Sequence, residues 1–218
     1  MSDGGAAATV PTVAQVRANL AGVRARVEAA GGDLATVRIV GVTKAFGPPV
    51  VQVARAAGLV DLGENYAQEL VAKQRSQKGA PGTTAAGDDA PPAPVWHFLG
   101  RLQTNKVRSL AGIVGLWQSV DRPELAREIA RRAPGAQVLV QINLSGEPQK
   151  GGCSFAEAPG LVTAARDLGL EVRGFMGVGP DGPPEGARAG FRELVALADG
   201  LGLPERSLGM SNDLEVAV

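Results

Sequence analysis

The chain of 218 residues contains little of several residue types, and each shortage limits its function. It has one cysteine and one histidine. One cysteine cannot form an intramolecular disulfide or a thiolate zinc site, and one histidine cannot build a metal centre of several imidazoles. The 22 Lys+Arg and 22 Asp+Glu give a formal net charge of zero. Because nucleic acids and anionic membranes are bound through basic surfaces, this balance argues against both partners.

Long apolar runs are also missing. No run approaches the roughly 18 residues of a membrane-spanning helix. The N-terminus, MSDGGAAATVPT, lacks the basic region and apolar stretch of a secretory signal. We therefore expect a cytoplasmic protein. Its basic residues comprise 17 Arg and only five Lys, namely Lys44, Lys73, Lys78, Lys106 and Lys150.

Strands and helices are predicted to alternate along the chain. Apolar residues recur at helical spacing over 13–27, after a capping-box signature formed by Thr12 and Gln15. The segment 37–43 is short, apolar and β-branched, which is typical of a strand covered on both faces. Similar strands are predicted at 59–63, 95–99, 115–120, 136–144, 171–178 and 206–210, with helices at 48–58, 65–76, 103–110, 122–132, 155–168 and 185–200. This alternation predicts βαβ units and a parallel sheet.

Two α/β architectures fit this pattern, an open doubly wound sheet and a (β/α)8 TIM-type barrel. An open sheet usually carries a Gly-rich turn after its first strand, and the segment TKAFG at 43–47 has no GxGxxG motif. Polar residues gather instead at the C-terminal ends of several predicted strands, where a barrel places its site. The sequence therefore favours a single barrel domain over 12–218, with a flexible N-terminus at 1–11 and a mobile insertion at 78–94.

Lys44 is the first candidate for chemistry. It ends an apolar strand, and barrel geometry directs its amine toward the central mouth, where partial desolvation favours the neutral form. A neutral amine can form a Schiff base with an aldehyde, such as that of pyridoxal phosphate. The alternative is a lysine that extends into solvent past the strand end.

The segments that follow two other strands offer further candidates, each with a structural alternative. Asn65 is either a helix N-cap or an amide that binds a ligand at the barrel mouth, and we expect Glu64 beside it to pair with a cation such as Arg101 or Lys106. Ser211 is either an N-cap or part of an anion site, because backbone N–H groups at a helix start and a hydroxyl bind phosphate. His97 lies between aromatic residues in a strand, which favours a core role over that of an acid or base.

Several segments of the chain occur in the order typical of one family. They are VTK at 42–44, GENY at 63–66, WHFLGRLQTNK at 96–106, SVD at 119–121, VQIN at 140–143 with Lys150 and Gly152, GFM at 174–176 and GMSND at 209–213. Together they resemble the pyridoxal phosphate homeostasis protein family over about residues 12–218. The segments at 96–106 and 209–213 are the most specific.

The resemblance implies a barrel like that of the alanine racemase N-terminal domain. It also implies that Lys44 holds pyridoxal 5′-phosphate (PLP) as a covalent aldimine, that Asn65 and Met210 contact the cofactor and that Ser211 takes part in the phosphate site. Family members are regarded as non-catalytic carriers or regulators in vitamin B6 and PLP homeostasis, so neither a catalytic residue nor a metal is implied. The recipients of the cofactor would be PLP-dependent enzymes in their apo forms.

The chain departs from the family pattern at three places, one of which is Arg101, where the family usually has a histidine. Phe46 stands where the family commonly has a second lysine. The family also continues into an eighth strand beyond the position of Val218, so we expect a barrel without its last strand in this chain. We expect a monomer or a weak dimer.

Two other functions stay open at this point. A PLP-dependent racemase or decarboxylase needs an acid or base placed beside the cofactor, and His97 is the remaining candidate of suitable pKa. A degenerate barrel without cofactor could instead serve protein interaction, because an open barrel exposes two strand edges.

Overall fold

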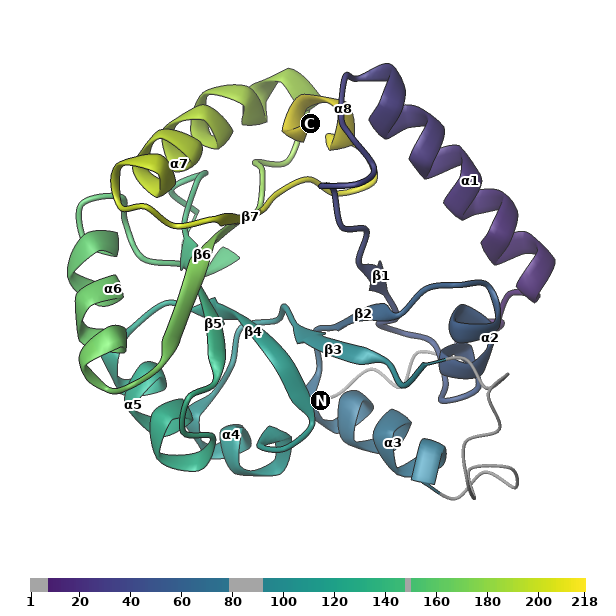
Figure 1. The fold of residues 1–218 in the computed structure, drawn as a ribbon, viewed down its shortest axis with the longest axis horizontal. Helices are drawn as coiled ribbons and strands as arrows, with labels where there is room; N and C mark the ends of the chain where they lie inside the picture. Colours follow the sequence, from purple (N-terminus) through teal and green to yellow (C-terminus); the bar gives the residue numbers. More distant parts are fainter. Residues whose placement is uncertain (1–7, 79–91, 148–149) are drawn as a thin grey trace.

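The computed structural model describes residues 8–78, 92–147 and 150–218. Seven parallel strands form one sheet whose order follows the sequence, from β1 to β7. The sheet curls on the inside of a ring of helices (Figure 1). This architecture confirms the predicted barrel-type α/β fold. It excludes the doubly wound sheet, in which the strand order reverses at a switch point.

Each strand leads into a helix that packs on the outside of the sheet. Helix α1 (Val13–Ala29) precedes the first strand and packs against α2 and α8 (Figure 1). The following pairs are β1 (Gly41–Val42) with α2 (Val50–Ala56), β2 (Asp61–Glu64) with α3 (Ala67–Lys78), β3 (Val95–Phe98) with α4 (Thr104–Leu110), β4 (Val114–Val120) with α5 (Pro123–Arg132), β5 (Gln137–Ile142) with α6 (Ala158–Asp167), β6 (Glu171–Gly177) with α7 (Arg188–Gly200), and β7 (Glu205–Ser207) with α8 (Leu214–Ala217). A 3-10 turn, η2 (Pro184–Ala187), precedes α7.

Local sequence signals explain several of these boundaries. The capping box before α1 is present, with the Thr12 side chain accepting from the Gln15 N–H and the Gln15 side chain accepting from the Thr12 N–H. The strand predicted at 37–43 is shorter than expected, because only Gly41 and Val42 pair with β2. The other strands and the helices lie within a few residues of their predicted positions.

β1 and β7 are the two edges of the described sheet. β1 pairs with β2 and β7 pairs with β6, and no strand joins the two edges within the described residues. The predicted flexible N-terminus and mobile insertion fall largely on residues 1–7 and 79–91, which lie outside the described residues. Among the helices that are described, none is long and apolar enough to cross a bilayer.

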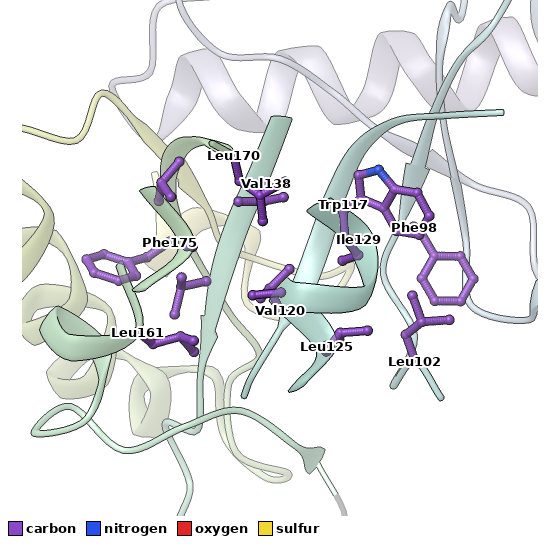
Figure 2. Close-up of a cluster of buried hydrophobic side chains, with 14 of the residues drawn as sticks. Phe98, Leu102, Trp117, Val120, Leu125, Ile129, Val138, Leu161, Leu170 and Phe175 are labelled. Atoms are coloured by element: carbon purple, nitrogen blue, oxygen red, sulfur yellow. The ribbon is translucent and has the colours of Figure 1, made fainter. Parts of the chain in front are cut away.

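Apolar side chains pack on both faces of the sheet. The larger cluster fills the space between the strands and the helices, and Figure 2 shows part of it, including Trp117, Ile129 and Phe175. A smaller cluster consists of Leu116, Leu139 and Met176. These three residues alternate with residues of the larger cluster along β4, β5 and β6, so they lie on the opposite, inner face. β4, β5 and β6 are thus buried on both faces, as is typical of a parallel sheet.

Candidate functional site

The four residues predicted to bind a cofactor all follow the C-terminal ends of strands. Lys44 follows β1, Asn65 follows β2, and Met210 and Ser211 follow β7. Because all strands are parallel, these segments lie at the same end of the sheet. β1 and β2 are neighbours, and the Thr43 N–H donates to the Gly63 carbonyl at 2.8 Å. Lys44 and Asn65 therefore leave adjacent strand ends, while Met210 and Ser211 come from the opposite edge of the curled sheet (Figure 1).

The Lys44 side chain is exposed. This exposure differs from the partial desolvation expected for its amine from the sequence. The next residue, Ala45, has φ of 67° and is the one non-glycine residue with positive φ in the described part of the chain. A left-handed conformation strains a residue that carries a Cβ atom, and such strain persists where surrounding contacts enforce it.

Directly behind this turn lies a buried ion pair between Lys73 of α3 and Glu64 of β2. The two side chains are 1% and 0% exposed, and Lys73 Nζ lies 2.5 Å from Glu64 Oε2. The ammonium also donates to the Thr43 carbonyl at 2.7 Å and to Glu69 Oε2 at 3.3 Å. Each of its three N–H groups therefore has an acceptor, which a buried charge requires.

Glu64 connects this ion pair to the segment that carries Asn65. Its second oxygen, Oε1, accepts from the N–H groups of Asn65 at 2.7 Å and Tyr66 at 3.2 Å. Glu64 thus forms the structural ion pair with a basic residue that the sequence suggested, but its partner is Lys73 rather than Arg101 or Lys106. Sequence reasoning missed Lys73, although it lies three residues after the buried Leu70 and hence on the same face of α3.

Asn65 does not act as the N-cap of α3, which begins two residues later at Ala67. Its side-chain amide has no hydrogen-bond partner among the described residues. The peptide of Asn65 packs closely on Gly100, where a Cβ atom would lie 2.0 Å from the Asn65 carbonyl oxygen. Only glycine fits at position 100, which explains the glycine of the WHFLG segment.

The turn after β7 is held by Asp213, which is 5% exposed and stands at the N-cap position of α8. Its Oδ1 accepts from the Met210 N–H at 2.5 Å. Ser211 is exposed and is not the N-cap. Arg26 of α1 also contacts this turn. It donates to the Ser211 carbonyl at 2.9 Å and forms an ion pair with Glu215 of α8.

Two of the hollows on the described surface bear on the location of the site. One of about 530 Å³ is lined by Asn65, Tyr66, Ala67, Gln68, Phe98, Arg101, Leu102, Gln103, Lys106 and Arg122, so it adjoins the β2 end of the candidate site. A larger one of about 800 Å³ lies between α1, α7 and α8. None of the four predicted cofactor residues lines the larger hollow, so size alone does not locate the site.

His97 is a core residue, as its sequence context predicts. It is 1% exposed; its Nε2 lies 2.9 Å from Asp61 Oδ1 and its Nδ1 lies 2.6 Å from Gln118 Nε2. Ser207 of β7 donates to Gln118 Oε1 at 2.6 Å, so the network connects four strands. Burial lowers the pKa of His97, while the hydrogen bond that its ring donates to Asp61 opposes this shift. Both ring nitrogens are engaged in holding strands together.

Other polar candidates have structural partners. Lys150 Nζ lies 2.9 Å from Glu147 Oε1 in an ion pair. Burial raises the pKa of Cys153 to about 11, which makes its thiol a poor nucleophile. The described residues contain no cluster of three or more His, Cys, Asp or Glu side chains that could hold a metal ion.

Comparison with known proteins identifies the class of this fold and site. The family model described as "Alanine racemase, N-terminal domain" matches residues 12–217. A pyridoxal phosphate homeostasis protein of Pseudomonas aeruginosa is 38% identical over 214 residues, which cover 92% of this chain and 87% of the relative. The chain therefore belongs to the pyridoxal phosphate homeostasis protein family and carries an alanine racemase N-terminal domain.

Solved structures agree with this assignment. PipY of Synechococcus elongatus with PLP bound matches with a TM-score of 0.76 at 27% identity, covering 93% of this chain and 92% of PipY. An alanine racemase of Clostridium difficile matches with a TM-score of 0.70, covering 93% of this chain and 52% of the racemase. At 14% identity, the racemase shows the likeness of fold alone.

Proposed function

We propose that this protein binds PLP, holds it as a Schiff base on Lys44 and serves vitamin B6 homeostasis without catalytic turnover. The observation that carries the proposal is the exposed Lys44 amine at the C-terminal end of β1, in a chain whose relatives are named for PLP homeostasis. When bound, the cofactor supplies an aldehyde that condenses with the Lys44 amine, forming a C=N bond and releasing water.

Side chains at the same end of the sheet as Lys44 suit a flat, phosphorylated ring. Six large apolar side chains are exposed among the described residues, and three of them, Val42, Tyr66 and Met210, lie at or after the C-terminal ends of β1, β2 and β7. Exposed apolar groups that cluster at one end of a fold are typical of a ligand site. The free amide of Asn65 and the hydroxyl of Ser211 supply polar groups for the ring and the phosphate.

The hydrogen bonds made by both ring nitrogens of His97 support a function without catalytic turnover. A racemase or decarboxylase needs a group that exchanges protons with the bound substrate. His97 is the only histidine of the sequence, and its two ring nitrogens contact Asp61 and Gln118. The function that fits is storage of PLP in the cytoplasm and its delivery to apo-enzymes.

An absorption titration tests this function. PLP added to the native protein should produce the visible band of a protonated Schiff base, and Lys44→Ala should abolish it. Lys106→Ala is the control, because it removes another lysine at the same end of the sheet and should leave the band unchanged. A band that survives in Lys44→Ala, or no band in the native protein, contradicts the proposal. Racemisation or decarboxylation of an amino acid by the PLP-loaded protein would support the enzyme alternative.

A further inference from the structure

We propose that Glu69 and Lys73 of α3 form a clamp that fixes the backbone on both sides of Lys44 and so positions its amine. The inference rests on the proposed function of Lys44. Lys73 holds the peptide before Lys44, through the bond of 2.7 Å from its Nζ to the Thr43 carbonyl. Glu69 holds the peptide after Lys44, because its Oε2 accepts from the Ala45 N–H at 3.1 Å.

The two halves of the clamp are joined to each other. The same Glu69 oxygen that accepts from Ala45 lies 3.3 Å from Lys73 Nζ. Glu69 and Lys73 are four residues apart on α3, so the helix sets their spacing. Glu64 anchors the arrangement from β2 through its buried pair with Lys73. The Lys44 backbone is thus tied to one rigid helix and one strand.

Ala45 shows that the turn needs such a clamp. Its φ of 67° costs free energy relative to the right-handed region, so the turn persists only while contacts enforce it. Two contacts do so at this residue, the Glu69 carboxylate on the Ala45 N–H and the Ala8 N–H on the Ala45 carbonyl at 3.0 Å. Without Glu69, Ala45 is expected to relax and to change the direction in which Lys44 leaves the strand.

Glu69 is the better half of the clamp to test, because its side chain is 36% exposed whereas that of Lys73 is 1% exposed. Glu69→Ala removes the acceptor for the Ala45 N–H. Glu69→Gln removes the charge but keeps an oxygen that accepts from Ala45. Glu124→Ala is the matched control, because Glu124 also lies in the first turn of its helix, far along the chain from Lys44.

Two measurements separate the clamp from the function of Lys44. Amide exchange of Ala45, followed by NMR without PLP, should be about tenfold faster in Glu69→Ala, which corresponds to the loss of one hydrogen bond. The rate of Schiff-base formation with added PLP should fall about fivefold to tenfold in Glu69→Ala, by the same reasoning. Glu69→Gln should restore both values, and Glu124→Ala should change neither.

The clamp is wrong if Ala45 exchanges equally fast in Glu69→Ala and Glu124→Ala, or if Glu69→Gln is as impaired as Glu69→Ala. Faster exchange with an unchanged rate of attachment would also overturn its positioning role. If native protein forms no Schiff base at all, the function proposed for Lys44 fails, while the exchange data still report whether Glu69 holds the turn.

Discussion

Replacing Lys73 with methionine should destabilise the protein strongly, although the two side chains are of similar length. The substitution removes three hydrogen bonds and leaves the carboxylate of Glu64, which is 0% exposed, without a counter-ion. Breaking a buried ion pair by removing one partner costs about 3–5 kcal/mol. The free energy of unfolding of a domain is about 5–15 kcal/mol, so about a fifth of it or more should be lost.

Urea denaturation followed by circular dichroism measures this loss. The double variant Lys73→Met/Glu64→Gln should recover part of it, because the amide keeps an acceptor for the Asn65 N–H but carries no unpaired charge. Arg132→Met is the control, since Arg132 pairs with Glu128 four residues earlier on the surface of α5, and exposed pairs contribute about 0–1 kcal/mol. A loss below about 1 kcal/mol in Lys73→Met would refute the reasoning, because it would place Glu64 in contact with water.

Two further predictions concern pH and thiol chemistry. Burial lowers the pKa of His97 below its ordinary value of 6.5, so the unfolded chain takes up this proton at a higher pH than the native protein does. The stability contributed by neutral His97 should be complete above pH 6.5. It should be lost as pH falls toward the lower native pKa, by at most about 1.4 kcal/mol per pH unit. His97→Gln should flatten the dependence of the free energy of unfolding in urea on pH in this range, and an unchanged slope would contradict the assignment. Since burial raises the pKa of Cys153 to about 11, a thiol reagent at pH 8 should modify the native protein about 100-fold more slowly than the urea-unfolded chain, and equal rates would show that the thiol is accessible.

The general fold could be predicted because it depends on periodicity. Apolar strands of β-branched residues and amphipathic helices alternate throughout, and the capping box at Thr12 and Gln15 marks where the first helix begins. The extent of β1 could not be predicted in this way. Residues 37–43 are uniformly suited to a strand, but only the part that meets a neighbouring strand can form one, and Gly41 and Val42 alone meet β2.

The chemistry behind Lys44 could not be predicted from local sequence. A lysine in a helix such as AQELVAKQRSQK usually extends into water, and its spacing from Leu70 alone does not predict that Lys73 is 1% exposed. Its burial depends on Glu64, which reaches the same position from β2. The pairing of two charged residues from different elements is a property of the assembled barrel.

The central claim is that Lys44 is the residue to which PLP becomes attached. The most direct measurement is borohydride reduction of the PLP-treated native protein, followed by peptide mass spectrometry across its five lysines. Attachment at Lys44 predicts a pyridoxyl adduct on the peptide that contains Lys44 and no adduct on the buried Lys73. An unmodified Lys44 after saturation with PLP, or an adduct carried mainly by another lysine, would contradict it.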